Sequence, residues 1–140
     1  MADLRNVVVF TLGGTRYAVE LRWIREVVTL GFVTGVPSAP PALGGVVNLH
    51  GSILPVVDVG AVLGHGPGPT PRQGDGALVL EADEITCALR VDQVDRVASL
   101  VARDDAVIDP EGRAIALLDP VRIVRMALDQ LTAAGGGPGA

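Results

Sequence analysis

The sequence predicts a mainly β protein made of two small β-barrels packed together, with short helices and a C-terminal α-helix. Three features predict this fold class: an internal repeat, short β-branched segments separated by glycine-containing turns, and one amphipathic segment near the C-terminus. Short strands that alternate with glycine turns are typical of small barrels rather than of an open sheet.

The internal repeat divides the chain into two related halves. Residues 6–28 align without a gap with residues 76–98, and residues 50–63 align with residues 111–124. The identical pairs are Val9 and Val79, Ala18 and Ala88, Val27 and Val97, Gly51 and Gly112, and Asp58 and Asp119. We therefore expect one domain over residues 1–132, with a first barrel over about 6–63 and a second over about 76–131.

The first half begins with a predicted hairpin. Residues 6–12 are apolar and β-branched, Gly13-Gly14 permits the positive φ angles of a tight turn, and residues 16–20 return as the second strand. A short helix or helical turn follows, predicted by the helical spacing of Leu21, Ile24, Val27 and Val28.

A second strand pair is predicted further along the first half. Residues 46–49 and 53–57 are joined at His50-Gly51, where glycine favours a turn. Asp58 is then a candidate N-cap for a helical turn that ends near Leu63.

The second half repeats this plan after a connecting loop over residues 64–76, which is rich in glycine and proline. Asp119 followed by Pro120 predicts the start of a terminal helix, because aspartate is a good N-cap and proline suits the first helical position. The apolar stripe of this helix is predicted to contain Val121, Val124, Leu128 and Leu131. We expect residues 133–140 to form a disordered tail.

Composition excludes several function classes. A net charge of −5 and a pI near 4.8 disfavour nucleic acid and anionic membrane surfaces as partners, since both require basic patches. The single cysteine, Cys87, excludes an internal disulfide and fits a reducing compartment. The sequence shows neither a secretion signal nor an apolar run long enough to cross a bilayer, which predicts a soluble, cytoplasmic protein without membrane insertion.

Candidate catalytic residues are few, and we expect no enzyme, cofactor or metal site. Phosphate-binding, zinc-protease and paired-cysteine motifs are missing from the sequence. Ser52, His50 and Asp58 are the residues of a conceivable nucleophilic triad, but a turn at Gly51 would separate the first two. Cys87 lies within an apolar strand and is interpreted as a buried structural thiol.

Residues 44–64 resemble the signature of the CheW-like family, which comprises bacterial chemotaxis coupling proteins and the matching regulatory domain of their histidine kinases. The matching positions in this segment are Gly45, Asn48, Leu49, Gly51, Pro55 and Asp58. Upstream, Glu26 matches the glutamate of an apolar-x-Glu-apolar step, and downstream the matching positions are Val91, Asp92, Val94 and Val97. The resemblance extends to about residue 131.

The resemblance implies two SH3-like, five-stranded barrels and a non-enzymatic adapter. Such an adapter couples the cytoplasmic tip of a chemoreceptor to the regulatory domain of a histidine kinase, and is recruited to membrane-associated receptor arrays. The groove between the barrels is the family's receptor-binding place. The matching positions here are Ile24, Glu26, Gly45, His50, Val94 and Val97. Trp23, the only tryptophan, is either a core anchor or a partner contact.

These residues also have purely structural interpretations. Apolar periodicity mainly reports burial, so Ile24, Val94 and Val97 are more often core than interface. Gly45 is expected to permit a close backbone approach, and Asn48 to satisfy turn backbone groups. Asp58 and Asp119 are better explained as helix caps than as ligands.

Two departures from the family pattern change the expected function. His50 replaces the arginine that the family usually has, so a pairing with Glu26 should weaken as pH rises and the imidazole loses its proton. The offsets of the two repeat alignments are 70 and 61, so the second half is about nine residues shorter. A specialised scaffold of a motility, polarity or developmental pathway, with fewer or changed partners, is therefore the main alternative. A small hydrolase and a self-associating scaffold remain further alternatives.

Overall fold

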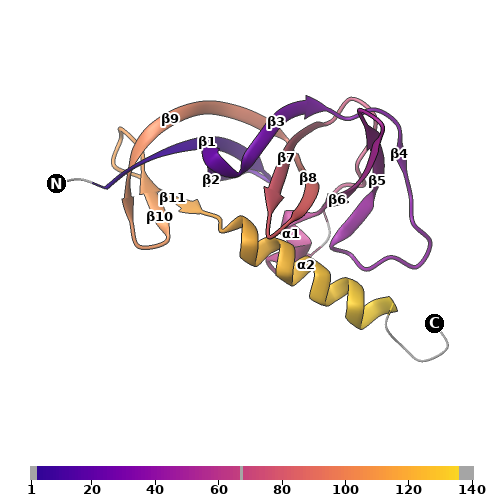
Figure 1. Ribbon diagram of the computed structural model, residues 1–140. Helices are drawn as coiled ribbons and strands as arrows, with labels where there is room; N and C mark the ends of the chain where they lie inside the picture. Colours follow the sequence, from indigo (N-terminus) through magenta and orange to yellow (C-terminus); the bar gives the residue numbers. More distant parts are fainter. Residues whose placement is uncertain (1–2, 67, 136–140) are drawn as a thin grey trace.

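The computed structural model describes residues 3–66 and 68–135, with side chains through residue 130. Within this part of the chain, a closed five-stranded barrel packs against a six-stranded sheet, and two helices lie along one side (Figure 1). The predicted fold class of two small SH3-like units with short helices and a C-terminal helix is confirmed. Neither helix has the length and apolar composition needed to cross a bilayer, as far as the described residues go.

The closed barrel takes strands from both ends of the chain. In spatial order it contains β1 (Leu4–Leu12), β2 (Thr15–Glu20), β11 (Ala114–Leu117), β10 (Ala106–Ile108) and β9 (Gln93–Arg103). All neighbours are antiparallel except β11 and β2, which run parallel.

The six-stranded sheet follows the same plan but stays open. In spatial order it contains β3 (Ile24–Thr29), β7 (Gly76–Ala82), β8 (Ile85–Val91), β6 (Ser52–Val57), β5 (Leu43–Leu49) and β4 (Val33–Thr34). Its parallel pair, β6 and β8, corresponds to β11 and β2 of the barrel. The edge strands β3 and β4 do not pair with each other.

The two halves of the sequence exchange one strand each. β3 belongs to the first half but pairs with β7, and β9 belongs to the second half but pairs with β1. This strand order corrects the expectation that residues 6–63 form one barrel and residues 76–131 the other. The physical reason is that apolar periodicity marks the buried face of a strand and does not determine which sheet the strand after each hairpin joins.

Strand register follows the repeat closely. Val9 lies opposite Ala18 on β1 and β2, as Val79 lies opposite Ala88 on β7 and β8. Both crossing strands also have a β-bulge at the same repeat position, at Arg25 in β3 and at Asp95 in β9. The halves are therefore equivalent in structure as well as in sequence.

The shortening of the second half lies between β9 and β10. In the first half, residues 30–42 connect β3 to β5 and include β4, whereas β9 and β10 are joined directly at Asp104–Asp105. β4 therefore has no counterpart in the barrel. The barrel nevertheless closes, because β9 continues to Arg103 and pairs with β10.

Tight turns occur at the two glycine-containing positions predicted from the sequence. Gly13 and Gly14 have φ angles of 60° and 80° between β1 and β2. His50 and Gly51, with φ angles of 53° and 88°, form the turn between β5 and β6. The helix predicted after β2 is limited to one 3-10 turn, η1 (Leu21–Trp23), because the following residues alternate in burial as strand β3.

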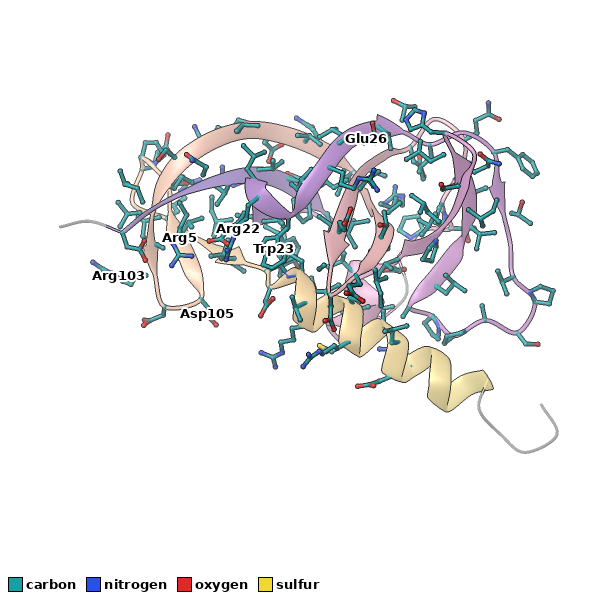
Figure 2. All side chains as sticks on the ribbon, viewed as in Figure 1. Arg5, Arg22, Trp23, Glu26, Arg103 and Asp105 are labelled. Atoms are coloured by element: carbon teal, nitrogen blue, oxygen red, sulfur yellow. The ribbon has the colours of Figure 1, made fainter. Side chains whose placement is uncertain are left out.

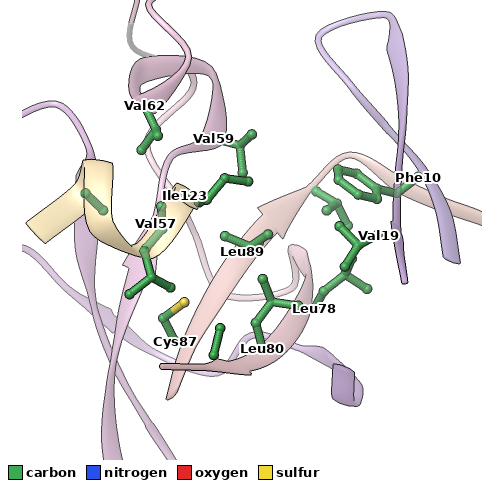
Figure 3. Packing of buried hydrophobic residues seen from close by; sticks show 14 of the residues in the cluster. Phe10, Val19, Val57, Val59, Val62, Leu78, Leu80, Cys87, Leu89 and Ile123 are labelled. Carbon is green, nitrogen blue, oxygen red and sulfur yellow. The ribbon is translucent and has the colours of Figure 1, made fainter. Parts of the chain in front are cut away.

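The core has three apolar clusters. One fills the closed barrel, one lies on the six-stranded sheet, and the third and largest lies between the two units and under the helices. Figure 3 shows this central cluster, where Phe10 and Val19 of the barrel pack near Leu78, Leu80 and Leu89 of the sheet. The units are therefore joined by a shared core.

The helices cover one side of this shared core. α1 (Val59–Val62) is short, and α2 (Pro120–Gly135) is the terminal helix. The buried face of α2 contains Ile123, Val124 and Ala127, whereas Leu128 of the predicted stripe is 41% exposed and the side chain of Leu131 lies outside the described part. Residues 133–135 are helical, which corrects the predicted start of the tail, and residues 136–140 lie outside the described residues.

Candidate partner-binding site

The structure brings Glu26 and His50 together. Nε2 of His50 lies 3.0 Å from Oε1 of Glu26. The strand β3 positions the glutamate, and the turn between β5 and β6 positions the histidine. The pair therefore links the edge strand β3 to the β5–β6 hairpin, at the place where the six-stranded sheet is not closed by backbone hydrogen bonds.

This pair is accessible to solvent. The side chain of His50 is 74% exposed and that of Glu26 is 38% exposed. Exposed ion pairs contribute only about 0.2–1 kcal/mol, and this one is an ion pair only while the imidazole is protonated. The geometry therefore supports a recognition role better than a major role in folding stability.

Val97 and its repeat counterpart Val27 are exposed apolar residues on the crossing strands. Val97 on β9 is 61% exposed and Val27 on β3 is 52% exposed. Both strands run along the upper side of the molecule in Figure 1, where the two units meet. Sequence reasoning selected Val97 and missed Val27, although the repeat alignment places the two at equivalent positions.

Further exposed apolar residues lie near the His50 turn and the β4 edge. Ile53, opposite Asn48 in the β5–β6 hairpin, is 64% exposed, and Phe32, just before β4, is 76% exposed. The sequence does not indicate the exposure of Ile53 and Phe32, because this exposure depends on how the neighbouring strands pack.

Ile24 and Val94 turn inward. Both are half-buried against the central core, and they occupy equivalent places opposite Leu80 and Phe10. The structure therefore favours the packing interpretation for these two predicted site residues.

Gly45 is required by close packing. Its φ is 149°, and a Cβ atom built there would lie 2.7 Å from Cγ1 of Val33 and 2.8 Å from the carbonyl oxygen of Thr34. Strand β4 can lie against β5 only because this side chain is missing.

The remaining motif residues have structural roles. Oδ1 of Asn48 accepts a hydrogen bond from the backbone N–H of Gly51 at 3.1 Å. Pro55 lies within β6 opposite Val46. Asp58 and Asp119 are the predicted caps, accepting hydrogen bonds from Ala61 of α1 at 3.1 Å and Val121 of α2 at 3.0 Å.

The residues of the conceivable nucleophilic triad are not assembled. His50 pairs with Glu26, whereas both carboxylate oxygens of Asp58 accept backbone N–H groups near α1. Cys87 is buried in the central core, where burial raises the pKa of its thiol to about 11. A thiol with so little thiolate is inert, as the structural interpretation expected.

Trp23 lies in a different place from Glu26. It is half-buried against the central core, and the guanidinium of Arg22 lies 4.8 Å from the centre of its ring. Figure 2 shows Trp23, Arg22 and Arg5 on the side of α2, with Glu26 on the opposite side.

Two triads of charged side chains occupy equivalent positions in the two halves, and the sign of every charge is reversed between them. Glu20 accepts hydrogen bonds from Arg5 and, at 2.8 Å, from Arg22. At the equivalent positions Arg90 donates to Asp75 at 3.0 Å and to Asp92 at 2.7 Å. Sequence reasoning missed these triads, although the repeat offset of 70 relates every member.

Two carboxyl groups in these triads, those of Glu20 and Asp75, have lowered pKa values. Burial opposes ionisation of Glu20, but the hydrogen bonds from Arg5 and Arg22 outweigh it and lower the pKa of the carboxyl group. Burial likewise opposes ionisation of Asp75, whose pKa is lowered by the backbone N–H of Arg72 and by the guanidinium of Arg90. Both carboxylates are therefore held in the charged form.

A solved structure with the same architecture is the scaffolding protein TtCheW from Thermoanaerobacter tengcongensis. The match has a TM-score of 0.69 and covers 88% of this chain and 92% of that chain, at 22% sequence identity. The fold thus defines a small protein of two packed SH3-like units, with several apolar side chains exposed on its surface.

The family follows from the sequence comparisons. The model of the CheW-like domain matches residues 6–106. The probable chemotaxis protein CheW of Rhizobium etli is 30% identical over 107 residues, which cover 76% of this chain and 66% of that protein. The chemotaxis protein CheW of Rhizobium meliloti is 32% identical over 101 residues, which cover 71% of this chain and 64% of that protein. The chain belongs to the CheW-like domain family.

The chain spans slightly less than two thirds of the length of these curated relatives. The descriptions of the relatives name chemotaxis and scaffolding, and none of them names a catalytic activity.

Proposed function

We propose that this protein is a non-enzymatic, cytoplasmic adapter that couples chemoreceptors to a histidine kinase in a chemosensory pathway. The Glu26–His50 pair is the observation that carries the proposal, because both residues stand at the positions through which the family resemblance assigns receptor binding. The relatives named above are chemotaxis proteins, which supports the same pathway for this chain.

The surface has the chemistry that a receptor tip requires. An amphipathic helix binds through apolar anchors, and a few charges fix its register. Val27 and Val97 supply exposed apolar contacts, and Glu26 with His50 supplies the charges. Each contact is weak alone, and a receptor array would make them effective together.

His50 can contact Glu26 in fewer ways than an arginine could. A guanidinium offers two parallel donors to a carboxylate, whereas the imidazole meets Oε1 of Glu26 through Nε2 alone.

A specialised scaffold with a changed partner set is the second candidate. The direct β9–β10 turn at Asp104–Asp105 supports it, since the corresponding connection of the first half carries the additional strand β4. Such a protein would bind one of the two partners, receptor tip or kinase regulatory domain, and not the other.

The test is reconstitution of the full chain with a cognate receptor tip and kinase. The adapter predicts binding to both partners and increased kinase activity in their presence, with weaker receptor binding for Glu26→Gln and Val97→Ser. Leu4→Ser is the matched control, because Leu4 is 59% exposed on β1. Binding to neither partner would contradict the adapter function, and binding to one alone would favour the specialised scaffold.

A further inference from the structure

The crossing strands β3 and β9 have opposite charges at equivalent positions. Glu26 of β3 aligns with Arg96 of β9 at the repeat offset of 70. Glu26 lies opposite Val79 of β7. Arg96 lies opposite Val9 of β1, which aligns with Val79 at the same offset. The strand register therefore supports the equivalence that the sequence alignment gives to the two charged residues.

The exposed valines that follow these charges lie on the inner side of each crossing strand. Val27 lies opposite Leu78 and Val97 opposite Val8, and both partners are buried in the central cluster. Residues directly opposite each other on neighbouring strands point to the same face of the sheet. Both valines therefore lie on the faces that the two units turn toward each other. The two charged residues lie on the other faces of their strands, because their partners belong to the separate cores of the two units.

The bulged residues just before these charges are engaged with the neighbouring hairpin strands. Nη1 of Arg25 lies 3.4 Å from Oε2 of Glu81 on β7. Oδ2 of Asp95 accepts a hydrogen bond from Oγ1 of Thr11 on β1 at 2.9 Å. Glu81 and Thr11 are themselves equivalent at the offset of 70. The contacts of the two bulges therefore match as well, although the charges of Arg25 and Asp95 are opposite.

Glu26 and Arg96 keep capacity for a partner. The imidazole of His50 meets Oε1 of Glu26, and no hydrogen bond within the described part of the chain uses Oε2. Arg96 is exposed, and among the side chains that the structure describes it takes part in no ion pair. One carboxylate and one guanidinium thus flank the two exposed valines.

The apolar part of this surface would accept a helix in either of two directions. Val27 and Val97 are equivalent and are 52% and 61% exposed, so reversing a bound helix end for end exchanges two similar contacts. The same reversal exchanges the helix side chains that face Glu26 with those that face Arg96. Because the two charges are opposite, one direction gives attraction at both positions and the other gives repulsion.

We propose that Glu26 and Arg96 together set the direction in which the receptor-tip helix lies across β3 and β9. This inference rests on the proposed adapter function, and it adds Arg96 as the residue that distinguishes the two orientations. The bound helix presents a basic side chain to Glu26 and an acidic side chain to Arg96, with apolar side chains between them on Val27 and Val97.

The first experiment measures the affinity of full-length variants for the cognate receptor tip by isothermal titration calorimetry. Arg96→Glu and Glu26→Arg should each weaken binding about two- to fivefold, which is the range of a single exposed charge contact. Arg103→Glu is the matched control for the first variant, because Arg103 is exposed at the other end of β9 and its substitution changes the net charge equally. The control should bind like the native chain.

A spin label on the receptor tip reports the direction. A nitroxide at one end of the contact helix should broaden the methyl signals of the nearer unit, represented by exposed Leu4 in the barrel and exposed Ile53 in the six-stranded sheet. The double variant Glu26→Arg/Arg96→Glu keeps the net charge of −5. It should bind more tightly than either single variant, and the broadening should move to the other unit.

The directional role is overturned if Arg96→Glu binds like the native chain, or if the double variant broadens the same unit as the native chain. Either result, with the native chain still binding the tip, overturns this inference and leaves the adapter function standing. A native chain that does not bind the tip overturns both.

Discussion

Gly45→Ala is the substitution whose effect can be worked out most fully from the structure. The new methyl group would lie 2.7 Å from Cγ1 of Val33 and 2.8 Å from the carbonyl oxygen of Thr34. Overpacking of this kind costs about 1–3 kcal/mol, and an alanine held at a φ of 149° costs about 1–3 kcal/mol more. Displacement of strand β4 can relieve the overlap but sacrifices its pairing with β5.

The free energy of unfolding should therefore fall by at least about 2 kcal/mol, a large part of the 5–15 kcal/mol typical of a domain. Urea denaturation at pH 7, followed by circular dichroism, measures this loss as a lower midpoint at unchanged slope. Gly35→Ala is the matched control, because no atom lies within 4 Å of its Cβ position and its φ is not positive. That variant should be neutral, or more stable by about 0.4–1 kcal/mol.

The result decides between two explanations of this position. A loss of stability would show that Gly45 is needed for the packing of β4 against β5. Native stability of Gly45→Ala, together with impaired receptor binding, would refute the packing explanation and make Gly45 a direct contact.

Three further predictions concern the core, the thiol and acid stability. Leu80→Ala should destabilise the protein by about 2–5 kcal/mol in urea denaturation, because Leu80 is fully buried in the central core, while the exposed Leu4→Ala changes little. Cys87 should resist iodoacetamide at pH 8 in the native state and react after unfolding, since its pKa is raised to about 11; rapid labelling of the folded protein would contradict this burial. The lowered pKa of Glu20 contributes stability that is present above its ordinary value of 4.5 and is lost as pH falls below it. Glu20→Gln should therefore flatten the decline of the urea midpoint between pH 5 and pH 3, and an unchanged decline would refute the contribution of this carboxylate.

The elements that follow local rules could be predicted from the sequence. Turns at Gly13-Gly14 and His50-Gly51, and caps at Asp58 and Asp119, depend on residues within a few positions of one another. Whether Glu26 pairs with His50 could not be told from the sequence, since nothing local in the sequence joins them.

The exchange of β3 and β9 could not be read from the sequence. Apolar periodicity reports that a segment is buried on one face and does not name the partner that buries it. The same limit explains the helix predicted over Leu21, Ile24 and Val27, where one helical turn leads into a bulged strand. Exposure of Val27 likewise depends on which sheet β3 joins.

The crossed strands mean that neither half of this chain is a self-sufficient folding unit. Residues 3–66 alone would lack β9, the longest partner of β1, and residues 68–135 alone would lack β3 beside β7. A break of the backbone between the halves should therefore yield two fragments that remain locked together as a heterodimer. A single ancestral half would have needed a second copy to supply the missing strand, as in a strand-swapped dimer. Gene duplication followed by fusion would then have joined the two chains of that dimer into one polypeptide.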